Sequence, residues 1–314
     1  MNNQVVQTVN KATVVGILKD KKIDFKVSST GREMAIGKLV VVCNTPLGKG
    51  EVEIKVMQME TKKDGTPNAL YKALQTIQNT YRTELSHGEG NGEIIKVEGQ
   101  LEDGTYYSVN KGDFVEKLEI KGTFINRVDE KEAHGCKVNI EGLISSITPV
   151  NDELEVEIVG IGYEGVAMPV KAMIPSNLVA DFQSKYAVGC TTSLYISILK
   201  TVTTEEVSDE AFFGDKFGEK ITRSVTKKII FGGSNVKYAG TVGAINPETV
   251  KQGLAIRQAK LESKKEDAIK RTSGGANMNV GFGAPQGTGF GAPQTEQGFG
   301  TMGTGFGGFG GFPQ

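Results

Sequence analysis

Strand-like and helical segments recur in the same order in two successive parts of the chain, and this repetition most constrains the fold. The later part contains five strand patterns and one helical segment. All of these segments are short, and the strand patterns are rich in β-branched residues. In chain order they are strands at 138–144, 154–159 and 166–174, a helix at 176–186, and strands at 192–199 and 226–231. The order is therefore three strands, one helix and two strands.

The earlier part repeats this order. Its strand patterns lie at 10–18 with a continuation at 23–27, and then at 34–43, 51–56, 94–101 and 115–128. A helix is predicted to begin near Pro67, with one apolar stripe formed by Leu70, Leu74, Ile77 and Tyr81 at intervals of four, three and four.

Three strands, a helix and two strands is the connectivity of the OB-fold, a five-stranded Greek-key barrel. The sequence therefore predicts a mainly β protein with two tandem OB-fold barrels, each with a helix between its third and fourth strands. The predicted boundaries are a flexible leader at 1–9, a first barrel at 10–130, a second barrel at 136–233, a charged helix at 246–271 and a Gly/Phe-rich tail at 274–314.

The two C-terminal segments differ in composition. Asn246 and Pro247 are typical of a helix N-cap and first turn, and a thin apolar stripe follows at Val250, Leu254 and Leu261. Both a solvated helix and a helix that docks on a partner fit this pattern. The tail repeats one Gly-Phe-Gly-Ala-Pro-Gln unit at 281–286 and 289–294, and we expect it to be disordered because it cannot bury enough surface to fold.

Composition excludes several classes of protein. With 36 Lys+Arg against 37 Asp+Glu, the chain does not coat nucleic acid by bulk positive charge, so any anion site must be local. The three cysteines, Cys43, Cys136 and Cys190, are odd in number and lack a Cys-x-x-Cys spacing, which predicts neither a disulfide framework nor a metal site. A reducing cytoplasm suits them, and we expect no signal peptide and no membrane span.

Sequence signals for catalysis are weak. His87 and His134 lie outside any recognisable nucleophile motif, and the Gly48-Lys49-Gly50 triplet lacks the spacing and the hydroxyl of a phosphate loop. We therefore predict a protein that is not an enzyme and that needs no cofactor.

Two short motifs in the earlier part resemble a known family. At Asn10 to Gly16 and Val97 to Leu101 the chain is similar to the bacterial and phage single-stranded DNA-binding proteins, whose barrels open with an Asn-Lys-Val-x-Leu-x-Gly-like strand and carry a Val-x-Val-x-Gly-x-Leu fourth strand. The resemblance covers about residues 10–128, and 137–231 by element order only. It implies a phage-encoded or bacterial cytoplasmic protein, homo-oligomeric, that protects single strands during replication or recombination.

The same resemblance bears on protein partners. In the family, a flexible tail with an acidic tip recruits replication and recombination proteins. This chain ends Gly311-Phe312-Pro313-Gln314 without acids, so recruitment through its tail is a weaker expectation, and self-association through the Phe repeats is an alternative.

Single-strand binding requires cations for phosphates and flat rings for bases, with stacking worth about 1–3 kcal/mol per base. In the first barrel the candidates are cations around the first inter-strand turn and a tyrosine pair with a lysine between strands four and five. They are Lys19, Lys21, Lys22, Lys26, Arg32, Tyr106, Tyr107 and Lys111. Because adjacent strand residues point to opposite sides, at most one of the two tyrosines should face a groove.

A long polar loop is predicted at 201–224 in the second barrel. Its candidate residues are Phe212, Phe213, Lys216, Phe217, Lys220 and Arg223. Nearby acids such as Glu205 and Glu206 would repel phosphate, and a β-hairpin arm that packs on a neighbouring subunit is an equal alternative.

We expect a single-stranded DNA-binding protein. One alternative is a phage structural or assembly protein that uses its barrels and tail to join other proteins, and a weaker one is an RNA-binding chaperone. Salt dependence separates the first two, and competition between ribo- and deoxyribo-oligomers tests the third.

Overall fold

The computed structural model describes residues 7–28, 31–45, 48–208 and 218–273. Up to residue 127 the elements are β1 (Asn10–Val27), β2 (Glu33–Thr45), β3 (Gly48–Met59), α1 (Ala69–Thr80), α2 (Glu84–His87), β4 (Ile94–Asp103), β5 (Tyr106–Ser108), β6 (Asp113–Val115) and β7 (Leu118–Arg127). The others are β8 (Gly135–Val150), β9 (Glu153–Ile161), η1 (Tyr163–Gly165), β10 (Ala167–Ile174), α3 (Ser176–Lys185), β11 (Thr191–Ser208), β12 (Gly218–Lys237) and α4 (Pro247–Ser273).

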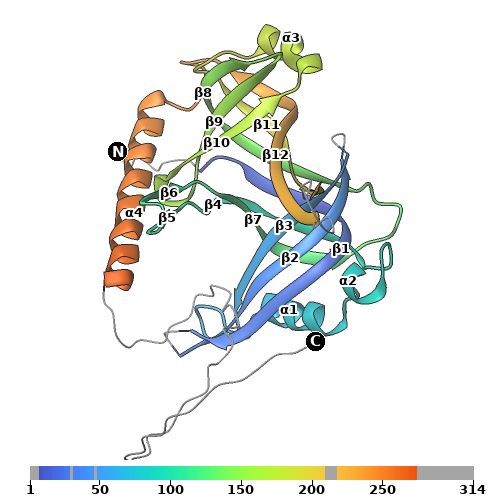
Figure 1. The fold of residues 1–314 in the computed structure, drawn as a ribbon. Coiled ribbons are helices and arrows are strands. Elements are labelled where there is room, and N and C mark those ends of the chain that lie inside the picture. The colour runs from blue at the N-terminus through green and yellow to red at the C-terminus, as the bar shows by residue number, and fades with distance from the viewer. Residues whose placement is uncertain (1–6, 29–30, 46–47, 209–217, 274–314) are drawn as a thin grey trace, which may run out of the picture. The chain divides into compact units, whose positions relative to one another are not determined.

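The strands of the first part close into a ring. β1 pairs with β2, β2 with β3, β3 with β7, β7 with β4, and β4 again with β1. The β3–β7 pair is parallel and the other four pairs are antiparallel, which is the Greek-key closure of an OB barrel. Figure 1 shows α1 beside these strands, between β3 and β4 in the chain.

The second part closes in the same way. β8 pairs with β9, β9 with β10, β10 with β12 in parallel, β12 with β11, and β11 with β8. The prediction of a mainly β protein with OB-type strand order, a helix between the third and fourth strands and a C-terminal helix is thus confirmed. Whether the two barrels fold as separate domains with the predicted boundaries stays a prediction.

Alternation of side chains builds each core. Along β3, Val52, Ile54 and Val56 are buried while the residues between them reach solvent. Helix α1 begins after Asn68, whose side chain accepts a hydrogen bond from the backbone N–H of Leu70, and it buries Leu74 and Ile77 as predicted. Tyr71 is buried in the place predicted for Leu70, which is only half-buried.

One glycine explains a motif that was seen in the sequence. A Cβ atom at Gly99 would lie 1.9 Å from the carbonyl oxygen of Lys121, at the β-bulge where the β4–β7 register shifts. Only glycine fits there, so the Val-x-Val-x-Gly-x-Leu pattern is a packing requirement of this barrel.

A backbone ladder joins the two barrels. β1 pairs with β8 over six residue pairs, from Asn10 with Ile140 to Val15 with Gly135, while its other edge pairs with β4. The ladder region begins before Asn10, because Thr8 exchanges hydrogen bonds with the backbone of Ile161. The predicted flexible leader at 1–9 is therefore wrong for Thr8, and residues 1–6 lie outside the described chain.

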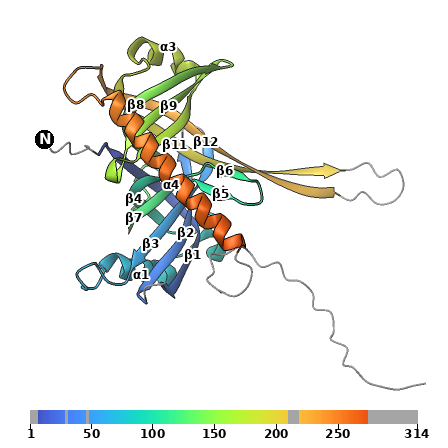
Figure 2. The ribbon, with the colours of Figure 1, turned by 90° about the vertical axis from the view of Figure 1, so that its left-hand side faces the viewer.

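Helix α4 packs on its own chain. The side chain of Asn246 accepts a hydrogen bond from the Glu248 N–H, as expected of an N-cap, and Val250 and Leu261 are buried. Leu254 is 38% exposed, so the predicted stripe is only partly used. Figure 2 shows α4 crossing in front of the strands, and the helix contacts η1, β5, β9 and β10 as well as Asp103 at the end of β4. The solvated alternative is therefore wrong for the buried face.

At 201–208 and 218–224 the predicted loop is wrong and the alternative, a β-hairpin arm, is formed, while its packing on a neighbouring subunit stays a prediction. β11 and β12 remain paired from Thr201 with Val225 to Ser208 with Gly218, so the segment forms a β-hairpin arm, which Figure 2 shows extending beyond the barrel. The tip at 209–217 and the predicted disordered tail at 274–314 lie outside the described residues. Among the helices that the structure describes, none is long and apolar enough to span a bilayer.

Candidate nucleic-acid interface

Three of the predicted cations of the first barrel, Lys19, Lys21 and Lys22, do not lie at a turn, whereas Lys26 and Arg32 lie on either side of the β1–β2 connection. β1 runs without a break from Asn10 to Val27, and a β-bulge between Leu18 and Asp20 bends it around the barrel. Lys19, Lys21 and Lys22 therefore lie within a strand, and the predicted break between 10–18 and 23–27 is wrong.

Lys21 is bound to backbone carbonyl groups at the end of α1. Lys21 Nζ donates to the carbonyl oxygens of Ile77 (2.8 Å) and Tyr81 (2.5 Å), so it caps the C-terminus of α1. Burial, and then the nearby charge of Arg127, lower the pKa of Lys21.

Arg32 and Lys19 also contact acceptor groups of the protein. The Arg32 guanidinium donates to the carbonyl oxygen of Thr61 (2.6 Å). Lys19 forms an ion pair with Glu51. Lys22 and Lys26 are exposed near the end of β1.

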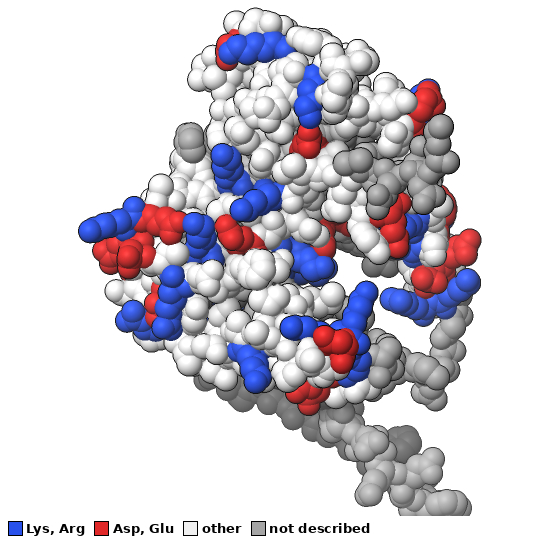
Figure 3. All heavy atoms as spheres, turned by 180° about the vertical axis from the view of Figure 1, so that it is seen from behind, with Lys and Arg blue, Asp and Glu red and all other residues white. Residues whose placement is uncertain are grey.

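Lysines on the outer surface of the first barrel are matched by glutamates on neighbouring strands. The nitrogen–oxygen distances are 3.3 Å for Lys38–Glu53, 3.1 Å for Lys55–Glu119, 2.9 Å for Lys121–Glu102 and 3.4 Å for Lys11–Glu98. Figure 3 shows basic and acidic side chains interspersed over one face of the molecule. A phosphate on these strands would meet a carboxylate beside most ammonium groups, which disfavours a continuous basic groove here.

The predicted tyrosines lie on the β5–β6 hairpin. Tyr107 packs edge-on against Phe114, with ring centroids 5.3 Å apart, and Lys265 of α4 lies 5.5 Å from its ring centroid. Tyr106 is 50% exposed, so one ring of the pair is available, in line with the alternation argument. Lys111 is exposed in the hairpin turn.

The candidates on the arm are placed only in part. The backbone of Lys220 pairs with Glu206 and that of Arg223 with Thr203, both within the hairpin. The four others, Phe212, Phe213, Lys216 and Phe217, lie outside the described residues.

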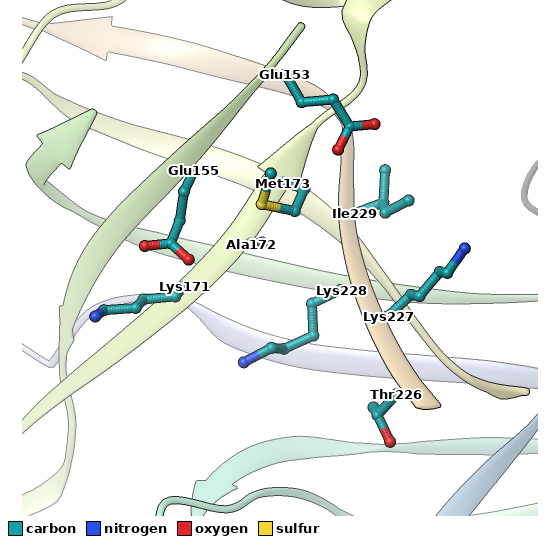
Figure 4. Close-up of a pocket in the computed structure, with 9 residues that line it drawn as sticks. All are labelled: Glu153, Glu155, Lys171, Ala172, Met173, Thr226, Lys227, Lys228 and Ile229. Atoms are coloured by element: carbon teal, nitrogen blue, oxygen red, sulfur yellow. The ribbon is translucent and has the colours of Figure 1, made fainter. Parts of the chain in front are cut away.

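A hollow of about 380 Å³ at the base of the arm brings together residues that the sequence analysis did not select. Lys171 on β10 and Lys227 and Lys228 on β12 line it, as Figure 4 shows, together with the apolar Met173 and Ile229. It lies where the parallel β10–β12 pairing is reduced to the single pair Met173–Ile229. In the OB-fold the second and third strands and the loop between the fourth and fifth hold the ligand, and this hollow lies beside those elements.

Lys228 is a partly buried ammonium with charges of both signs near it. Burial lowers the pKa of Lys228, Glu116 and Glu155 act in the opposite direction, and the nearby Lys171 is a smaller cause that lowers it again. An ammonium that is partly withdrawn from water gains more from a phosphate than an exposed one does. The rim also carries Glu153 and Glu155, so the site is locally cationic and not uniformly basic.

The hollow continues into a smaller one towards the first barrel. Lys171 and Lys228 line both, and the smaller hollow adds Lys117 and Arg257 as well as acids. Together the two hollows present five cations and five carboxylates: Lys117, Lys171, Lys227, Lys228 and Arg257 against Asp103, Glu116, Glu153, Glu155 and Glu157. Three cations already have acid partners: Arg257 with Asp103, Lys117 with Glu119, and Lys171 with Glu157 at 3.8 Å.

A metal centre has no support in the described ranges, where no group of three or more His, Cys, Asp or Glu side chains is placed to hold an ion.

A family model described as YorF matches residues 8–267, which span both barrels and most of α4. The chain belongs to the YorF family. No curated protein matches the sequence of this YorF-family chain.

Solved structures similar to this YorF-family chain include single-stranded DNA-binding proteins. Wild-type single-stranded DNA binding protein from Thermus aquaticus is 10% identical, with a TM-score of 0.45 and coverage of 78% of this chain and 99% of that one. A deletion mutant of that protein is 12% identical, with a TM-score of 0.44 and coverage of 77% and 98%. A replication protein A heterotrimer bound to ssDNA is 7% identical, with a TM-score of 0.20 and coverage of 71% and 49%.

The predicted resemblance to single-stranded DNA-binding proteins is thus found again among solved structures. These likenesses are distant, so the assignment of the OB topology rests on the strand pairings described above.

Proposed function

We propose that this protein binds single-stranded DNA without catalysing a reaction, and that the hollow at the base of the arm is a principal contact. The observation that carries the proposal is that Lys171 on β10 and Lys228 on β12 lie on one side of the hollow, with Lys227 on its other side (Figure 4), beside the ligand-binding elements of an OB barrel. Met173 and Ile229 supply an apolar floor for bases beside these cations.

The mixed charge of the surface predicts weak binding at high salt. Because only a few ammonium groups would contact phosphates, the affinity should fall with salt by about 0.7 of a log unit per contact for each tenfold increase in salt.

The test is fluorescence anisotropy with labelled oligo-dT over a salt series. Lys227→Gln/Lys228→Gln should bind roughly tenfold or more weakly at low salt and with a shallower salt slope. The matched control is Lys251→Gln/Lys270→Gln, which removes the same charge from exposed positions on α4. Equal losses in both double variants would contradict this site, and no binding by the wild type at low salt would contradict the function.

The role of an assembly or interaction protein remains the second candidate. The paired lysines and glutamates of the first barrel and the β-hairpin arm favour it, since near-neutral surfaces and strand arms suit protein partners. Binding to a protein partner would persist at high salt. A third candidate, RNA binding, is tested by competition with ribo-oligomers.

The cellular role, location, oligomeric state and protein partners of this chain are further predictions. Participation in replication or recombination, a phage origin, a cytoplasmic location, homo-oligomer formation and recruitment of partners through the tail stay predictions. Truncation before Gly274 tests the tail, because it should weaken self-association while leaving oligo-dT affinity unchanged.

A further inference from the structure

A second hollow, of about 210 Å³, lies at the ladder between the barrels. Thr13 and Val15 on β1, Lys137 on β8, Ser197 on β11 and Phe231 on β12 contribute to its lining. Thr13 is the ladder partner of Lys137, and Ser197 follows the β11–β8 pair Ile196–Val138. The hollow is thus built from adjacent strands of both barrels, on the fourth- and fifth-strand side of the second barrel.

The lining differs from that of the other hollows described above. It includes a cation, an aromatic ring and hydroxyl groups, and no Asp or Glu is among its described residues. A phosphate near Lys137 would therefore meet no carboxylate within the lining. This is the charge pattern that the outer surface of the first barrel lacks.

The rings of Phe231 and Tyr195 lie close to each other and to the ammonium group of Lys137. Phe231 is 38% exposed, and its ring centroid lies 6.2 Å from that of Tyr195. Lys137 Nζ lies 4.1 Å from the centroid of the Tyr195 ring, and the Tyr195 hydroxyl lies 3.1 Å from Ser234 Oγ. Tyr195 is therefore held in place, while Phe231 presents ring surface to a ligand.

One buried polar group in the lining lacks a partner. Ser197 is 2% exposed, and its buried Oγ makes no hydrogen bond. Nearly all buried hydroxyls in folded proteins are paired, so an unpaired one beside a hollow marks a position that a ligand's polar edge can satisfy. At about 210 Å³ the hollow is below the ~300–1,000 Å³ range of drug-sized ligands, which suits a single ring system.

We infer that this hollow receives one nucleobase of the bound strand, which stacks on Phe231 and hydrogen-bonds to Ser197 while Lys137 contacts the adjoining phosphate. The inference rests on the proposed binding of single-stranded DNA and adds a subsite away from the arm. An aromatic side chain of a protein partner is the competing occupant.

The experiment uses the absence of tryptophan from the chain. Phe231→Trp introduces a single indole that keeps the stacking surface, and oligo-dT should quench its fluorescence on binding. Phe124→Trp, at an exposed aromatic position on β7 of the first barrel, is the matched control and should not respond. Phe231→Ala should weaken oligo-dT binding roughly fivefold or more, and Phe124→Ala should leave it unchanged.

A smaller substitution tests the hydroxyl. Ser197→Ala preserves the packing of the strand, and it should weaken binding a few-fold without lowering the melting temperature. The inference is overturned if oligo-dT binds, as measured by anisotropy, while Phe231→Trp fluorescence and the affinities of Phe231→Ala and Ser197→Ala do not change. In that case the proposed function stands, whereas absence of all oligo-dT binding would instead remove the proposed function.

Discussion

Arg257 Nε on α4 donates a 2.6 Å hydrogen bond to Asp103 Oδ2 at the end of β4, and both side chains are largely buried. Lys264 Nζ on the same helix donates to the carbonyl oxygen of Thr105, 3.1 Å away. At its other end the helix buries Val250 against Leu143 and Val159 of the second barrel. α4 therefore contacts both barrels and links them.

Arg257→Gln should lower the free energy of unfolding by about 1.5–3 kcal/mol, because the largely buried Asp103 carboxylate would lose its charged partner. Urea denaturation at pH 7 measures this. Lys251→Gln is the control, since its ion pair with Glu248 is exposed and should change stability by no more than about 0.5 kcal/mol. Similar losses of unfolding free energy in the two variants would contradict a stabilising role of the Arg257–Asp103 pair.

The same pair predicts a pH dependence. Burial raises the pKa of Asp103, but hydrogen bonds from Arg257 and Thr105 outweigh burial, so its pKa lies below the usual value. The stabilisation is therefore present above the unfolded-state pKa of about 3.9 and is lost as the pH falls through the lower folded-state pKa. The stability difference between wild type and Arg257→Gln should shrink below pH ~4, and a difference that stays constant down to pH 2 would contradict this.

Burial of the thiols predicts a loss of stability in alkali. Burial raises the pKa of Cys136 to about 11, and burial followed by the proximity of Cys136 raises that of Cys43. Unfolded thiols ionise near pH ~8.5, so the stabilisation is complete below that pH and is lost as the pH rises through the folded-state values. The free energy of unfolding should fall between pH ~8.5 and ~11, and it should fall by less in Cys136→Ala than in the wild type. If it falls equally steeply with pH in both proteins, the raised pKa of Cys136 is contradicted.

Gly99→Ala should destabilise the first barrel by about 1–3 kcal/mol, because its Cβ would lie 1.9 Å from the Lys121 carbonyl oxygen and would force the β4–β7 bulge apart. Thermal unfolding measures the effect. At Gly135 the nearest atom to an added Cβ is 3.9 Å away, so Gly135→Ala is the matched control and should be near neutral. Equal tolerance of both substitutions would contradict the packing argument.

Local sequence patterns predicted the order of the elements because alternation and helical spacing are properties of single segments. The stripe of Leu74 and Ile77 and the N-cap at Asn246 are of this kind. The continuity of β1 through Lys19 and Lys22 was missed because a bulge lets a run of polar residues stay in a strand.

The candidate site was less predictable because it depends on pairing between distant segments. Lys171 and Lys228 meet only because β10 and β12 pair in parallel, and neither segment signals the other. Similarly, the register of neighbouring strands places Glu53 beside Lys38 and Glu119 beside Lys55. Sequence counts of lysine therefore overstate the cations available to phosphate.

If the protein binds single-stranded DNA as proposed, the six-pair ladder between β1 and β8 also limits the length of DNA that one molecule can cover. Two barrels on a loose tether could spread along DNA or fold back, and their footprint would then vary with conditions. Here such a swing would break several backbone hydrogen bonds at once, so the length of DNA occluded per molecule should be the same at every salt concentration at which the complex forms.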